Sequence, residues 1–78
     1  MNKKFRKLLE QIKDVHLRDR VQLAIPEIYQ KQFVKFLMGA KKIKPFFMKW
    51  LGKNFEARTA LELVMPLKEA LGDGEKVR

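Results

Sequence analysis

The apolar positions of this chain repeat mostly with the period of an α-helix. Over residues 3–17 they fall three or four positions apart and share one face, while basic residues occupy most of the rest. This pattern predicts an amphipathic helix over residues 3–17. Its apolar face consists of Phe5, Leu8, Leu9, Ile12 and Val15.

Two further stripes of the same period follow in the middle of the chain. The first predicts a helix over residues 26–40, which begins at Pro26 and ends at Gly39 and a lysine-rich segment. The second predicts a helix over residues 45–55, because Pro45 suits the first position of a helix. The apolar members of the two stripes are Ile28, Tyr29, Phe33, Phe36, Leu37 and Ala40, and then Phe46, Phe47, Trp50, Leu51 and Phe55.

A last helix is expected over residues 59–71. It would begin at Thr59, because Thr59 and Glu62 have the spacing of a capping box. Pro66 lies in the middle of this range, so we expect the helix to be kinked or split there. Residues 73–78 are expected to form a frayed tail.

Residues 20–25 carry a different pattern. Val21, Leu23 and Ile25 alternate with polar or small residues, which is the period of a half-buried strand. Pro26 disfavours a helical backbone at Ile25 and so adds to the case for a strand. The residues that would instead fit a helical stripe are Leu17, Val21, Ala24, Ile25 and Ile28. We therefore expect a mainly α fold with one short strand; an all-α small helical bundle is the alternative.

A single strand has a consequence for the assembly of the protein. Its backbone N–H and C=O groups have no partner within one chain. Antiparallel pairing with the same strand of a second copy would satisfy these groups and form a two-stranded ribbon. The prediction is therefore a homodimer in which residues 20–25 pair between the two chains.

The composition adds a strong positive charge to this picture. With 78 residues, 46% of them hydrophobic, the chain is expected to form a single domain over residues 1–78. Its formal net charge is +9, and the segment between Ile28 and Phe55 contains seven lysines and no acidic residue. Such a charge attracts nucleic acid or an anionic lipid surface. No apolar run approaches the roughly 20 residues that span a bilayer, so we expect a cytoplasmic protein without a membrane span.

The residues that commonly carry catalysis are scarce. The chain has no cysteine and no serine, and its one small hydroxyl, on Thr59, is assigned to a helix cap. His16 is the only histidine, so a metal site would need carboxylates as its other ligands. The glycines do not form a phosphate-binding loop. We expect no enzymatic activity, no metal, no cofactor and no small-molecule substrate.

The segment from Arg20 to Phe55 resembles the ribbon-helix-helix family of DNA-binding proteins, that of the Arc- and MetJ-type repressors. The resemblance consists of the alternating "RVQLAI", the proline directly after it, a helix, a short basic turn and a second helix. It implies that the apolar strand residues face a shared core and that the alternate residues, Arg20, Gln22 and Ala24, face the bases. It also implies that a backbone phosphate is held at the start of the second helix, near Lys42, Lys44 and Phe46.

These observations lead to a hypothesis about function. We expect a small basic nucleic-acid-binding protein, a homodimeric DNA-binding transcriptional repressor or accessory factor with its ribbon in the major groove. Arg20 could bond guanine and Gln22 adenine. Four lysines would hold the phosphate backbone and make binding dependent on salt: Lys41, Lys42, Lys44 and Lys49. DNA is favoured over RNA.

Two alternatives stay open at this point. If residues 17–25 are helical, the chain could be a monomeric all-helical adaptor that binds another protein; a structured-RNA binder is the other possibility. The aromatic residues between Phe46 and Phe55 alternate with lysines. We expect these rings to fill a helical core, although the same pattern occurs where unpaired bases stack or where a helix lies on a membrane.

Overall fold

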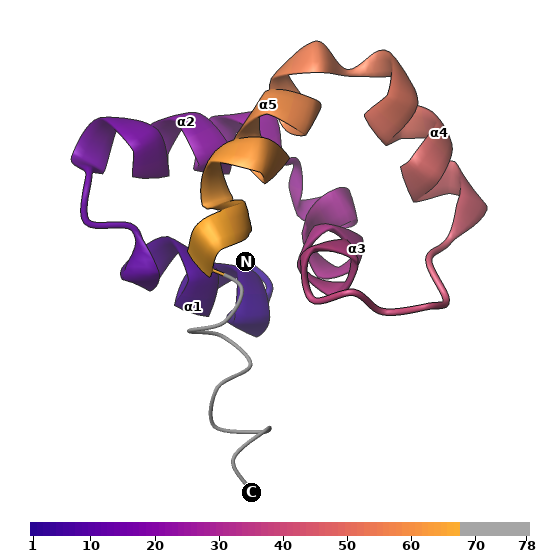
Figure 1. Ribbon diagram of the computed structural model, residues 1–78, viewed down its shortest axis with the longest axis horizontal. Coiled ribbons are helices and arrows are strands. Elements are labelled where there is room, and N and C mark those ends of the chain that lie inside the picture. The colour runs from indigo at the N-terminus through magenta and orange to yellow at the C-terminus, as the bar shows by residue number, and fades with distance from the viewer. Residues whose placement is uncertain (68–78) are drawn as a thin grey trace, which may run out of the picture.

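The computed structural model describes residues 1–67, and these residues fold into α-helices and one 3₁₀ turn (Figure 1). The elements are α1 (Lys3–Gln11), α2 (Val15–Ala24), α3 (Glu27–Leu37), α4 (Pro45–Lys53), α5 (Phe55–Val64) and η1 (Met65–Leu67). Within the described part of the chain no strand occurs. The predicted strand over residues 20–25 is therefore wrong, and the all-α small helical bundle that stood as its alternative is the fold.

The helix predicted over residues 3–17 is two helices, α1 and α2. The Arg18 guanidinium donates from Nε and Nη2 to the carbonyl oxygen of Ile12 (3.3 and 3.0 Å), the residue that ends α1. Asp14 begins α2, because its carboxylate accepts hydrogen bonds from two backbone N–H groups of the first turn. An N-cap of this kind stabilises a helix by about 1 kcal/mol. The two caps together account for the break.

Burial explains why α2 is a helix. Val21 and Ile25, four positions apart, are both fully buried, whereas the Leu23 side chain between them is 85% exposed. A strand would place all three on one side, but a helix places the middle one on the outside. Pro26 is accommodated because α2 ends at Ala24 and Ile25 has an extended backbone (φ −116°, ψ 97°).

The helices predicted over residues 26–40 and 45–55 are present with shorter bounds, as α3 and α4. Gly39 follows the end of α3 with a φ of +80°, a backbone conformation that glycine adopts without strain. Lys44 is the N-cap of α4, and Pro45 occupies its first turn as expected.

The last predicted helix begins four residues earlier than expected. Asn54 ends α4 and also begins α5, and its side-chain oxygen accepts a hydrogen bond from the Ala57 N–H (2.9 Å). Thr59 therefore lies inside α5, and the predicted capping box is wrong. α5 ends at Val64 and gives way to η1 at Met65, directly before Pro66, where a kink or split was expected. The rest of that prediction, and the tail over residues 73–78, lie outside the described residues.

The main helix–helix contacts form a closed ring. Along this ring α1 packs on α2, α2 on α5, α5 on α4, α4 on α3, and α3 on α1 (Figure 1). Every helix of the ring contributes side chains to one core. The core residues are Phe5, Leu8, Leu9, Ile12, Val21, Ile25, Phe33, Val34, Leu37, Phe47, Leu51, Ala57, Ala60, Leu61 and Val64.

The position of α3 in this ring changes which of its residues are buried. Phe33 contacts Phe5 of α1 edge to face (ring centroids 6.1 Å apart), while Phe36 contacts Phe47 of α4. Because two sides of α3 are covered, Val34 is buried although it lies off the predicted stripe. Ile28, which the stripe included, is 68% exposed.

Candidate nucleic-acid interface

Seven exposed lysines lie on α3, on α4 and in the segment between the two helices, residues 38–44. We call them the lysine surface. Its members are Lys31, Lys35, Lys41, Lys42, Lys44, Lys49 and Lys53. No acidic residue occurs between Ile28 and Phe55. The whole segment therefore carries charge of one sign.

Neither of the two ion pairs within residues 1–67 involves a lysine of the lysine surface. One joins the amino group of Met1 to Glu27 (3.3 Å), and the other joins Arg20 Nε to Glu56 Oε1 (3.6 Å). Among the described residues, the ammonium groups of the lysine surface are thus exposed and without a carboxylate partner. They are available to an external anion.

Three of the four arginines among the described residues are engaged within the fold. Arg58 donates from Nη1 to the carbonyl oxygens of Leu51 and Gly52 (3.1 and 2.6 Å) at the end of α4. Arg18 does the same for α1, and Arg20 has its ion pair with Glu56. A cation near the C-terminal end of a helix also interacts favourably with the helix dipole.

A buried glutamine positions the lysine-rich segment before α4. Gln32 on α3 is only 6% exposed, and its Oε1 accepts a hydrogen bond from the backbone N–H of Lys44 (3.1 Å). This bond fixes the last residue before α4 against α3. Gln32 was not among the residues predicted from the sequence to be functional. Its only sequence signal is a polar residue beside the apolar stripe of α3, which does not distinguish a buried amide from a solvated one.

A second buried glutamine, two residues earlier on α3, performs a similar task. Gln30 is 5% exposed; its Oε1 accepts from the backbone N–H of Asn2 (3.1 Å), and its Nε2 donates to the Ile25 carbonyl oxygen (3.2 Å). It therefore links the start of α1 to the turn between α2 and α3. Among the described residues, no fully buried side-chain nitrogen or oxygen atom lacks a hydrogen-bond partner, as is usual for buried polar groups.

The aromatic residues of α3 and α4 form one cluster, mostly as the core filling that the sequence predicted. Tyr29 and Trp50 stack face to face with centroids 4.0 Å apart and ring planes 11° apart, and Phe47 is fully buried. Phe46 differs because 45% of it is exposed. It lines an open hollow of about 670 Å³, which we call the Phe46 hollow. The lining residues are Ile43, Pro45, Phe46, Met48 and Lys49.

The structure separates the six predicted site residues into two groups. Lys41, Lys42 and Lys44 directly precede α4, and Lys49 lies in its second turn. Arg20 and Gln22 lie on α2, which sits across α5 from α4 (Figure 1). The two groups are therefore on different helices at opposite sides of the ring.

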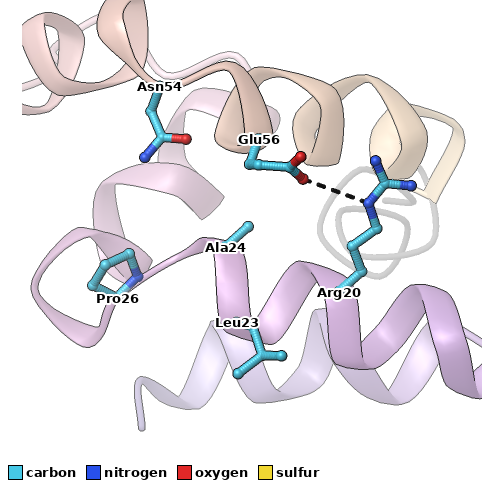
Figure 2. Close-up of a pocket in the computed structure, with 6 residues that line it drawn as sticks. All are labelled: Arg20, Leu23, Ala24, Pro26, Asn54 and Glu56. Atoms are coloured by element: carbon cyan, nitrogen blue, oxygen red, sulfur yellow. Dashed lines mark ion pairs between the residues drawn. The ribbon is translucent and has the colours of Figure 1, made fainter.

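Arg20 is held at another hollow, between α2 and the start of α5, with a volume of about 480 Å³. Figure 2 shows its guanidinium directed at the Glu56 carboxylate, with Ala24 pointing toward α5 and Leu23 pointing away from it. We call this the Arg20 hollow. Its lining residues are Arg20, Leu23, Ala24, Pro26, Asn54 and Glu56. The assignment of Arg20 and Gln22 to a ribbon that reads bases is wrong, because no ribbon exists within residues 1–67.

Two other properties of the described residues bear on the interface. None of their helices has the length and apolar character that a membrane crossing requires. Within residues 1–67, no group of three or more histidine, aspartate or glutamate side chains is placed to hold a metal ion.

Comparisons of this chain with models of protein families, with curated proteins and with solved structures find no match.

Proposed function

We propose that this protein binds nucleic acid through the lysine surface, by contacts to the phosphate backbone. The observation that carries the proposal is the combination of seven exposed lysines, no acidic residue in the same segment, and no ion pair from any of these lysines to another group of residues 1–67. Lysines that bind phosphates release counterions from the nucleic acid, which makes the association favourable at low salt.

The geometry of α4 supports the same proposal. Its first turn follows Lys44 directly, and no side chain caps it. The backbone N–H groups at the start of a helix carry a partial positive charge and favour anions nearby. Three lysines within the four residues before Pro45 add their full charges to that end of the helix.

The proposal differs from the sequence-based hypothesis in one respect. Base reading by Arg20 and Gln22 required an extended ribbon, and α2 is helical at these positions. We therefore propose an accessory protein that contacts the backbone, in place of a repressor that recognises one operator. Phosphate contacts orient a protein on nucleic acid but carry no sequence information.

The test is the salt dependence of oligonucleotide binding by the purified full chain. If all seven lysines contact phosphates of a duplex, affinity should fall roughly 10³- to 10⁴-fold between 50 and 200 mM salt. The triple variant Lys41→Gln, Lys42→Gln, Lys44→Gln should bind more weakly and reduce the slope of log K against log salt by about 2 to 3. Fluorescence anisotropy of a labelled oligonucleotide measures both quantities.

A matched control removes the same charge elsewhere. Lys3, Lys4 and Lys7 are exposed on α1, away from segment 38–44 in Figure 1, and can be replaced by glutamine together. We expect this control to keep most of the affinity and slope. Equal losses in the two triple variants would contradict the proposal, and so would binding that does not change with salt.

A second candidate function is protein binding at the Arg20 hollow, with another copy of the chain as the partner. Leu23 and Ile28 are among the most exposed large apolar side chains of the described residues; Leu23 lines the hollow, and Ile28 lies two residues after the lining residue Pro26. Arg20 and Glu56 place both signs of charge there, and a twofold contact would bring each of them near the opposite charge of a second copy. Sedimentation over a range of concentrations tests this, and Leu23→Asp should shift any dimer to monomer.

A further inference from the structure

We propose that the nucleic acid bound at the lysine surface is single-stranded, with an unpaired base against the Phe46 ring in the Phe46 hollow. This inference rests on the proposed function and adds the class of nucleic acid to it. Its basis is the position of one exposed aromatic ring among lysines that have no internal partner within residues 1–67.

The first step concerns which aromatic ring of the cluster is accessible. Tyr29 and Trp50 cover each other face to face at 4.0 Å, and Phe47 is fully buried. Phe46 touches the cluster through Tyr29, with centroids 5.6 Å apart and planes tilted by 33°. It is therefore held by the cluster while 45% of it remains exposed. A ring fixed on one side and open on the other can accept a second ring.

The second step concerns the surroundings of that ring. The hollow beside Phe46 is lined by the apolar side chains of Ile43, Pro45 and Met48 and by Lys49. Its open volume of about 670 Å³ accommodates a flat heterocycle together with part of its sugar. An apolar wall suits the face of a base, since every base has a π face that stacks on an aromatic side chain.

The third step concerns the backbone that must accompany the base. Phe46, Lys49 and Lys53 stand at positions i, i+3 and i+7 of α4, so they share one face of the helix. Lys44 precedes the same helix directly. A strand whose base lies on Phe46 therefore has ammonium groups on both sides of that base. The apolar hollow and the positive rim together fit an aromatic polyanion.

The fourth step distinguishes single strands from duplexes. In a duplex the base faces are stacked on each other, so the Phe46 ring cannot reach them and only the lysines contribute. An unpaired strand offers phosphates and base faces at once. Base–aromatic stacking contributes enough to change affinity about 5- to 150-fold per base. The structure therefore favours a single strand at equal salt.

The experiment compares two ligands and four proteins. The ligands are a fluorescent oligothymidylate of about twelve nucleotides, within the site sizes common for single-strand binders, and a hairpin duplex with the same number of phosphates. The proteins are the full chain and its variants Phe46→Ala, Phe46→Tyr and Phe55→Ala. Phe55 is the matched control because it is an even more exposed ring (68%) that lies outside the Phe46 hollow.

We expect the unaltered chain to bind the single strand more tightly than the hairpin. Phe46→Ala should weaken single-strand binding about 5- to 150-fold, leave hairpin binding unchanged and leave the salt slope unchanged, because it removes no charge. Phe46→Tyr and Phe55→Ala should bind like the unaltered chain. The fluorescence of Trp50, the only tryptophan, should change on single-strand binding because Trp50 and Phe46 both contact Tyr29.

Three outcomes would overturn the inference, and each is distinct. Equal affinity for both ligands, with no effect of Phe46→Ala, removes the stacked base and leaves the phosphate contacts of the proposed function. Absence of salt-dependent binding to either ligand removes the proposed function as well. Binding to vesicles of anionic lipid that depends on Phe46, with no oligonucleotide retained, assigns the hollow to a membrane surface. If Phe46→Ala lowers the melting temperature sharply, Phe46→Leu keeps an apolar contact with Tyr29 and removes only the aromatic face.

Discussion

At the scale of the residue, arginine and lysine have different tasks in this protein. Arg18 and Arg58 each donate two hydrogen bonds to backbone carbonyl oxygens where a helix ends, a role that suits the rigid fork of a guanidinium. The lysines between α3 and α4 make no ion pair within residues 1–67. Both residue types contribute +1 to the net charge, so composition does not distinguish cations that hold the ends of helices from cations that make no ion pair. Only the hydrogen bonds and ion pairs of the folded chain make this distinction.

Leu23 and Ile25 provide a test of the helical backbone of α2. In a strand both side chains would lie on the buried side, and their loss would have similar effects. In the helix Ile25 is fully buried and Leu23 is 85% exposed. We therefore expect Ile25→Ala to lower the free energy of unfolding by about 2–5 kcal/mol. Leu23→Ala should change it by no more than about 0.5 kcal/mol.

Urea unfolding followed by circular dichroism measures both variants under the same conditions. The pair is closely matched, because the two residues have similar size and lie two positions apart. Comparable losses in the two variants would contradict the orientation of α2.

At the scale of the element, the connections between helices are defined by single polar groups. Asn54 alone separates α4 from α5 and caps the second of them. Asp14 begins α2 in the same way. Gln32 holds the residue before α4 by its hydrogen bond to the Lys44 N–H. The lysine-rich segment 38–44 therefore has a fixed end, although no helix covers it.

Gln32→Leu should reveal how far that fixed end matters. The variant keeps the side chain's approximate volume but removes the acceptor of the Lys44 N–H. We expect the free energy of unfolding to fall by about 1–3 kcal/mol. We also expect oligonucleotide affinity to fall several-fold, because the lysines of segment 38–44 would be ordered only on binding.

Gln22→Leu is the matched control, since Gln22 is exposed on α2. It should change stability by less than about 0.5 kcal/mol and leave affinity as it is. An affinity unaffected by Gln32→Leu would show that segment 38–44 needs no support from α3.

At the scale of the whole molecule, the closed ring of five helices places a net charge of +9 on a small structure. Few attractive contacts counter the repulsion among these charges, because the described residues contain only two ion pairs and both are exposed to solvent. Like charges confined to a compact state repel each other and lower its stability relative to the unfolded chain. The same repulsion is relieved when a polyanion binds.

This repulsion predicts that salt stabilises the free protein. Raising sodium chloride from about 0.01 to 0.15 M shortens the screening length from about 30 to about 8 Å. We therefore expect the free energy of unfolding to increase over that range, as measured by urea titrations at each salt concentration. Stability that falls with added salt would mean that attractive pairs dominate the electrostatics of the fold.

The apolar pattern and the composition alone predicted helical segments over residues 26–40 and 45–55 and the single sign of charge between Ile28 and Phe55. Proline positions account for much of the agreement between predicted and observed helix boundaries. Pro45 can begin a helix and Pro66 cannot continue one, whatever packs around them. Charge is likewise a property of composition. The four lysines expected to bind phosphates were named from that property, and their role stays a prediction.

The helical state of residues 20–25 depends on packing between helices, which the pattern along the chain does not contain. Over six residues a period of two and a period of 3.6 both place Val21 and Ile25 on one side, and only Leu23 distinguishes them. The packing of α2 on α5 buries the first two and leaves Leu23 outside. The burial of Gln32 and the formation of the Phe46 hollow also result from packing between helices. Each depends on which helix lies opposite, and spacing along one chain carries no such information.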